Sequence, residues 1–180
     1  PNDIVFDQQG GFWFTDHGKN RPRDKDRTGV YYASIDGQQI KEVIFPLEAP
    51  NGIGLSPDEA TLYVAETPTG RVWAFDIKAP GELGGSRRML AQLPDYHMFD
   101  SLAVDSAGNV CVATLITGGI TVHSADGATA RLIDMPDILT TNICFGGDNL
   151  QTAFITLSAT GKLVSMPWHC PGLPLNFLNR

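Results

Sequence analysis

One phrase recurs four times along the chain and constrains its fold more than any other feature. Each copy begins with Asn or Asp, runs through a short apolar segment, passes a tight turn and enters a second apolar segment. The copies begin, at intervals of about 40 to 50 residues, at Asn2, Asn51, Asp100 and Asn142. A third segment opens in each copy with a glycine, at Gly29, Gly70, Gly119 and Gly161. Such self-similarity indicates a row of equivalent structural units.

The composition of the segments predicts that these units are β-sheets. β-branched and aromatic residues dominate, and no sustained 3.6-residue apolar period favours helices. A fourth segment follows in the first three copies, at 39–44, 87–91 and 129–133. Four strands in a unit of about 40 to 50 residues are typical of a propeller blade. We therefore expect an all-β fold, a β-propeller of four-stranded antiparallel blades, with about four blades in this chain.

The repeats divide a single domain into four predicted blades and a tail. Their approximate bounds are 2–48, 51–98, 100–139 and 142–168, and the proline-rich tail covers 169–180. A charged insertion at 17–28 and a glycine-rich stretch at 81–85 are predicted to be loops. An unclosed propeller would expose sheet edges. We therefore expect further chain upstream, or a second chain or copy that completes the ring.

Composition narrows the classes of partner. The formal net charge of −7 argues against nucleic acid, because phosphate binding needs a basic face. No apolar run approaches the ~20 residues of a membrane helix, so no membrane span is expected. Cys111, Cys144 and Cys170 match no zinc-ligand spacing and are predicted to be buried free thiols. This favours a reducing, cytoplasmic location over a periplasmic or secreted one.

Propeller geometry brings the starts of the four copies together. The first strand of each blade lines the central channel, and the second strand returns to the same face. The residues expected at the channel mouth are Asn2, Asn51, Asp100 and Asn142. Asp16 and Glu66, which end second strands, are expected nearby. Oxygen ligands of this kind favour binding of Ca²⁺, or of Mg²⁺ or Mn²⁺ in its place. The alternative to a cation site is a polar channel filled with water.

Several motifs resemble the SMP-30/gluconolactonase family, also called regucalcin-like. They are ND at 2–3, PNGI at 50–53, SPD at 56–58, LYVAET at 62–67, DSLAVD at 100–105 and PGLPLNF at 171–177. The resemblance covers essentially the whole chain and corresponds to the C-terminal three-fifths of a family member. It implies a six-bladed propeller that binds one divalent cation and hydrolyses lactones, or in some relatives organophosphate esters.

The resemblance also implies roles for individual residues. The implied metal ligands are Asn2, Asn51 and Asp100, with Zn²⁺ a further alternative to Ca²⁺. Asn2 matches a position that contacts substrate in some members, and Asp100 matches the proposed general base. Asn142 matches no invariant ligand and is expected, like Asp16 and Glu66, to support the site from outside the ligand set. The family's first-blade Glu ligand has no counterpart here, so this fragment alone could be inactive.

Two histidines lie in loops that enter the predicted mouth. His17 and His97 are therefore candidates for substrate contact. Asp3 and Asp105 are expected to bond the backbone or a second ion, and the charges at 19–27 to form a solvated lid. No nucleophile elbow is present, which weighs against a serine hydrolase.

The resulting hypothesis is a divalent-metal-dependent hydrolase that acts on a lactone through a metal-activated water. Asp100 would take the proton from that water. The expected partner is a small-molecule lactone or ester. The alternatives are an organophosphate or ester hydrolase that uses the same site, and a metal-binding propeller without catalytic activity.

Overall fold

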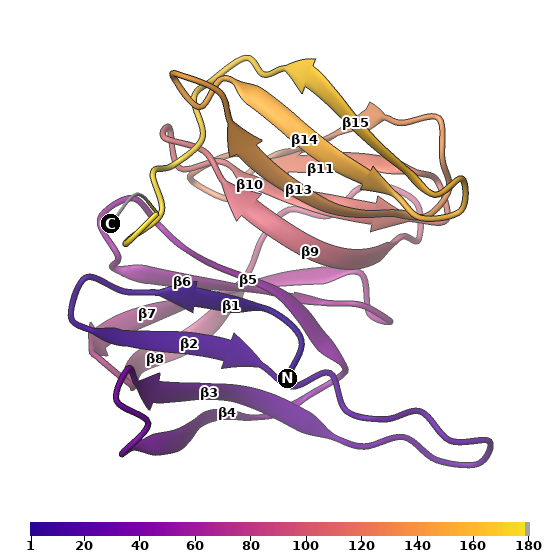
Figure 1. The fold of residues 1–180 in the computed structure, drawn as a ribbon. Coiled ribbons are helices and arrows are strands. Elements are labelled where there is room, and N and C mark those ends of the chain that lie inside the picture. Colours follow the sequence, from indigo (N-terminus) through magenta and orange to yellow (C-terminus); the bar gives the residue numbers. More distant parts are fainter. Residues whose placement is uncertain (179–180) are drawn as a thin grey trace.

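The computed structural model describes residues 1–178 and folds them into four antiparallel sheets (Figure 1). The first sheet contains β1 (Ile4–Phe6), β2 (Gly11–Thr15), β3 (Thr28–Ser34) and β4 (Ile40–Leu47). The second contains β5 (Pro50–Leu55), β6 (Thr61–Glu66), β7 (Arg71–Ala79) and β8 (Glu82–Met89). The third contains β9 (Met98–Val104), β10 (Val110–Leu115), β11 (Gly119–His123) and β12 (Ala130–Asp134). The last contains β13 (Thr140–Gly146), β14 (Thr152–Leu157) and β15 (Lys162–Pro167).

The strands follow chain order within every sheet, as successive hairpins require. Three sheets have four strands, and the last has three within the described residues. This arrangement confirms the prediction of an all-β fold built from propeller blades. No helix within residues 1–178 is long and apolar enough to cross a membrane.

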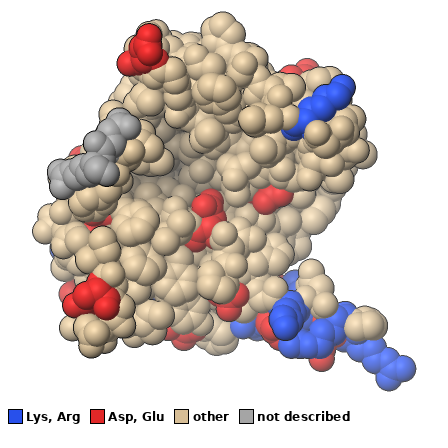
Figure 2. All heavy atoms as spheres, viewed as in Figure 1, with Lys and Arg blue, Asp and Glu red and all other residues tan. Residues whose placement is uncertain are grey.

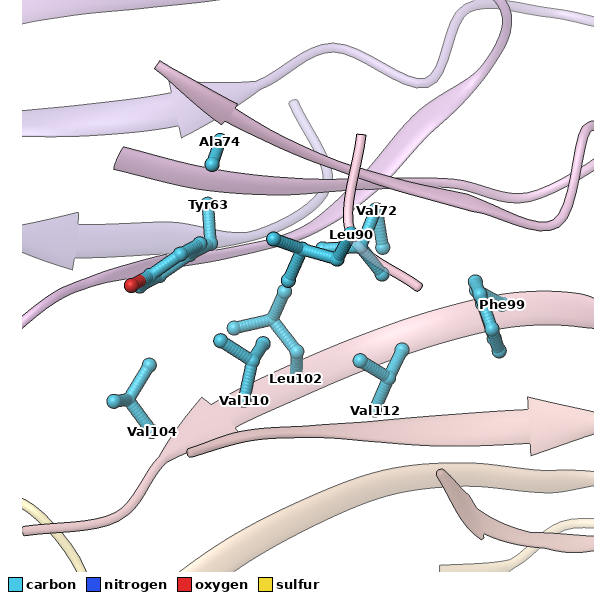
Figure 3. Packing of buried hydrophobic residues seen from close by; sticks show 10 residues of the cluster. Tyr63, Val72, Ala74, Leu90, Phe99, Leu102, Val104, Val110 and Val112 are labelled. Carbon is cyan, nitrogen blue, oxygen red and sulfur yellow. The ribbon is translucent and has the colours of Figure 1, made fainter. Parts of the chain in front are cut away.

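The sheets contact one another through their first strands. β1 packs against β5, β5 against β9, and β9 against β13, so the four strands lie side by side through the middle of the molecule (Figure 1). The core lies between neighbouring sheets. Figure 3 shows one such layer, where Tyr63 and Val72 of the second sheet face Leu102 and Val110 of the third. Strands buried on both faces need apolar residues at consecutive positions, which explains the continuous apolar run in β6.

The prediction of a loop at 81–85 is wrong. β8 begins at Glu82 and includes Gly84 and Gly85, so the fourth strand starts earlier than the apolar residues indicate. β8 is an edge strand whose pairing with β7 is interrupted by register shifts. Gly85 has a φ of 68°, a conformation that glycine adopts without steric cost. Glycines in such a distorted edge strand resemble those of a loop when only the sequence is considered.

The cysteines are free thiols, but the prediction that they are buried holds only for Cys111. Cys144 is exposed and Cys170 is half-buried. In β13 the side chains alternate, so Ile143 is buried and Cys144 is exposed, although both contribute to the wall of a cavity along the first strands. An apolar run therefore does not guarantee that every residue in it is buried.

Candidate functional site

The first strands of all four sheets line one cavity of about 350 Å³. Its wall is largely apolar, with Ile4, Leu102 and Ile143 among its residues, and Leu173 and Leu175 of the C-terminal segment complete it. The polar side chains Asp3 and Asn142 also line it. Figure 2 shows acidic side chains beside a hollow near the middle of this face.

Asn51 and Asp100 lie together because the backbones of β5 and β9 approach closely at Gly52. A Cβ atom on Gly52 would lie 2.6 Å from the Leu102 nitrogen and 2.8 Å from the Asp100 carbonyl oxygen. Only glycine leaves room for this approach. The Asn51 side chain lies close enough to Asp100 to lower the pKa of that carboxyl, so residues from neighbouring sheets share one site.

Asp100 and Asp3 are two carboxylates in a partly desolvated environment. Burial raises the pKa of Asp100, and the Asn51 amide and the nearby His17 oppose that rise. Burial raises the pKa of Asp3 to about 6, and the negative charge of Asp100 contributes to the rise. The ionised form of both groups is therefore disfavoured, and a bound cation would offset this cost.

The backbone holds the Asp3 carboxylate in place. Its Oδ1 accepts a hydrogen bond from the Ile4 nitrogen at 2.9 Å, and its Oδ2 accepts one from the Ile53 nitrogen at 3.3 Å. The Asp3 nitrogen donates to Thr15 Oγ1 at 3.1 Å, and that hydroxyl donates to the Asn51 carbonyl oxygen at 2.7 Å. These bonds fix Asp3 relative to Asn51 across the junction of the first two sheets.

Asn51 carries an unsatisfied oxygen. The residue is 5% exposed, and its Nδ2 donates to Thr67 Oγ1 at 3.2 Å. Its Oδ1 is buried and has no hydrogen-bond partner in the described part of the chain. Leaving such an atom unpaired costs about 1–3 kcal/mol. A cation bound there would remove that cost.

This donor set is compatible with a hard cation. It contains two carboxylates and an amide oxygen, the ligand types that Ca²⁺ prefers. No group of three or more His, Cys, Asp or Glu residues that could hold a metal occurs within residues 1–178. Since Ca²⁺ takes six to eight oxygens, Asp3, Asn51 and Asp100 would supply only part of its coordination.

The remaining residues predicted at the mouth differ in their surroundings. Asn2 is exposed, and its backbone nitrogen donates to the Thr15 carbonyl oxygen at 2.7 Å. Asp16 lies 3.6 Å from the N-terminal amine and accepts a hydrogen bond from the Gly18 nitrogen. His17 lies close enough to Asp100 to influence its pKa.

The other predicted residues have local partners of their own. Asn142 is exposed, and its Oδ1 accepts a hydrogen bond from the Ile143 nitrogen at 2.8 Å. His97 is buried, and its Nδ1 lies 2.9 Å from Thr117 Oγ1 beside a separate pocket. Glu66 is 3% exposed and accepts three hydrogen bonds, each of 2.8 Å, from Glu48 N, Thr69 Oγ1 and Trp73 Nε1.

Asp3 accepts hydrogen bonds from the backbone, as the sequence predicted, and it also lies near Asp100. Asp100 is not the only carboxylate at the site, because Asp3 lies close enough for the two charges to interact. An alternative alignment of the repeats could have indicated it. The segment DIVF at 3–6 matches NICF at 142–145, and both open with a side chain that accepts a hydrogen bond from the next backbone nitrogen.

The charged insertion forms the loop that projects between β2 and β3 (Figure 1). Figure 2 shows Lys and Arg concentrated on it. Arg21 pairs with Asp24 at 3.0 Å and with Asp26 at 2.6 Å, and Lys25 pairs with Glu48. This pairing leaves less positive charge available for binding an anion.

Comparison with known proteins places this chain in a family. The sequence model of the SMP-30/Gluconolactonase/LRE-like region matches residues 1–159. The lactonase drp35 of Staphylococcus saprophyticus is 37% identical over 139 residues, covering 75% of this chain and 42% of the relative. A gluconolactonase of Zymomonas mobilis is 31% identical, covering 88% and 48%. The diisopropyl-fluorophosphatase of Loligo vulgaris is 29% identical, covering 95% and 58%.

Solved structures of similar fold include a gluconolactonase, as the sequence relatives do. A gluconolactonase of Xanthomonas campestris superposes with a TM-score of 0.76 at 31% identity, covering 93% of this chain and 56% of that one. The calcium-binding protein regucalcin from Agrobacterium tumefaciens has a TM-score of 0.78 at 20% identity, covering 97% and 64%, and supports the fold alone. The chain spans about half the length of the curated relatives it matches. Together with the propeller blades, the match over residues 1–159 shows that the chain belongs to the SMP-30/gluconolactonase family.

Proposed function

We propose that this chain carries the larger part of a divalent-cation-dependent hydrolase site that acts on a lactone. The observation that carries the proposal is the buried, unpartnered Asn51 Oδ1 within the described chain, next to Asp100. The relatives named lactonase and gluconolactonase support the substrate class. Ca²⁺ is the favoured ion, because every donor in the set is an oxygen.

The side chains of this site suit hydrolysis by water. When bound, a divalent cation would polarise the lactone carbonyl and lower the pKa of a neighbouring water. Asp100 is then the general base that accepts the proton of the attacking water. Its burial raises its affinity for a proton, which is what a base working near neutral pH requires. Asp3, held by two backbone N–H groups, would be a further oxygen ligand beside Asn51 and Asp100.

Hydrolysis of an organophosphate ester is the second candidate. The observation that favours it is the similarity to the squid diisopropyl-fluorophosphatase over 95% of this chain. Activation of an attacking water by Asp100 would serve either a carbonyl carbon or a phosphorus centre. Assays with gluconolactone and a fluorophosphate in parallel distinguish the two reactions.

The test is turnover by the complete protein with and without a chelator, because Asp3, Asn51 and Asp100 would supply only part of the coordination of a cation such as Ca²⁺. We expect gluconolactone hydrolysis that EDTA abolishes and that added Ca²⁺ or Mn²⁺ restores. Asp100→Asn should lower kcat by about 10²-fold or more, because the loss of general-base catalysis typically costs that much. Turnover that neither EDTA nor Asp100→Asn changes would contradict the proposal. Cation binding without turnover on either substrate would favour the non-catalytic propeller.

A further inference from the structure

We infer that Thr67 is a positioning residue that decides which end of the Asn51 amide faces the candidate cation site. The inference rests on the function proposed above and extends it to a residue outside the set of cation ligands. The two ends of an amide have nearly the same shape, but only the oxygen can bind a cation. A site that uses asparagine therefore needs something that fixes the orientation of the amide.

Two acceptors lie near the NH₂ group of Asn51, which has two hydrogens to donate. Thr67 Oγ1 accepts a hydrogen bond from Nδ2 at 3.2 Å, and the Asp100 carboxylate lies close enough to the amide for its pKa to be lowered by it. Together they hold the nitrogen and leave Oδ1 as the end without a hydrogen-bond partner in residues 1–178. Once Asp100 is engaged with a cation, the Thr67 hydroxyl is the acceptor that still holds the amide.

Thr67 is itself held firmly. The residue is 7% exposed, and its backbone nitrogen donates to the Ala49 carbonyl oxygen at 3.3 Å, two residues before Asn51. The preceding residue, Glu66, is buried and accepts hydrogen bonds from Glu48 N and from Trp73 Nε1. These bonds tie the segment that carries Thr67 to the residues just before Asn51, so the backbone keeps the hydroxyl within reach of the amide.

The inference predicts a loss of cation affinity when the hydroxyl is removed. Thr67→Val keeps the shape of the side chain but supplies no acceptor to Nδ2. Loss of a group that orients a ligand typically weakens metal binding about 10- to 100-fold, and we expect a change of that size. Thr67→Ser restores an acceptor at the same place and should stay within about threefold of the wild type.

The experiment measures Ca²⁺ affinity by calorimetry and Tb³⁺ affinity by luminescence on the 180-residue chain. Thr121→Val is the matched control, because Thr121 is also a buried threonine and its Oγ1 lies 2.6 Å from Thr114 Oγ1. It should lower the unfolding midpoint without changing the Kd for either cation. Thr67→Ala is the second variant, for use if valine prevents folding.

A double mutant separates orientation from general damage. Asn51→Asp replaces the amide by a carboxylate, whose two ends are both oxygens and need no orientation. In that background Thr67→Val should change the Kd by no more than about threefold, far less than the 10- to 100-fold expected in the wild type. An equal loss in both backgrounds would overturn the inference, because it would show that Thr67 acts in another way.

The outcomes distinguish this inference from the function on which it rests. If the wild type binds neither Ca²⁺ nor Tb³⁺, the proposed cation site is wrong and the inference fails with it. If the wild type binds and the Thr67→Val and Thr67→Ala variants bind equally well, only the inference is overturned. Weak binding by Thr67→Ser as well would also overturn it, since the hydroxyl would then not be the cause.

Discussion

At the level of single residues, the buried His123 makes the stability of the fold depend on pH. It is 1% exposed, its ring lies edge-on to Phe99 with centroids 5.8 Å apart, and burial lowers its pKa to about 4. The folded state therefore keeps His123 neutral, while the unfolded chain binds a proton below about pH 6.5. Its contribution to stability is complete above that pH and is lost as the pH falls towards 4.

Replacing His123 should flatten the acid side of the stability profile. Between pH 7 and pH 4.5 this histidine should cost the wild type about 2.5 kcal/mol of unfolding free energy. The His123→Leu variant lacks this titrating group. Its free energy of unfolding should therefore fall by about 2.5 kcal/mol less than that of the wild type between pH 7 and pH 4.5, as measured from urea unfolding curves at both pH values. The carboxylates titrate in both proteins, so the difference between them isolates the histidine. Identical pH dependence in the two would show that His123 is not held neutral.

At the level of elements, the site depends on the close approach of β5 and β9. Gly52→Ala would place a Cβ atom against the backbone of Asp100 and Leu102, which cannot move without separating the strands. We expect a loss of about 1–3 kcal/mol in stability, as overpacking typically causes, together with weaker Ca²⁺ binding. Both effects can be measured on the same sample by urea unfolding and calorimetry.

Gly54→Ala is the control in the same strand. Its Cβ atom would meet the ends of the Leu102 and Val104 side chains, which can change rotamer. It should cost less stability and leave the Kd for Ca²⁺ unchanged. Equal losses of affinity in the two variants would argue against a specific role for the approach at Gly52.

The repeats made the elements predictable, because a period of about 40 to 50 residues with four strands per unit leaves few architectures. Asn51 and Asp100 could be placed together for the same reason. The repeat pattern does not decide between Asn2 and Asp3 as the inward-pointing residue, because a shift of one residue at a strand end changes which side chain points inwards. β5 and β9 carry register shifts near their starts, and the paired residues of β1 do not. Such irregularities are invisible in the repeat pattern.

At the level of the whole molecule, the first strands of four separate sheets line one cavity, and the candidate ligand Asp3 is among the residues of its wall. No single sheet supplies more than one of the three candidate ligands, which lie on or just before β1, β5 and β9. The formal net charge of −7 favours accumulation of cations around the molecule. The account therefore predicts one specific cation site, distinct from diffuse binding to surface carboxylates.

An anomalous difference map from a crystal of this chain soaked in Mn²⁺ tests that claim most directly. We expect one strong peak within about 2.5 Å of Asn51 Oδ1 and an Asp100 carboxylate oxygen, weakened in Asp100→Asn crystals. A strong peak elsewhere on the acidic surface, with no density beside Asn51, would contradict it.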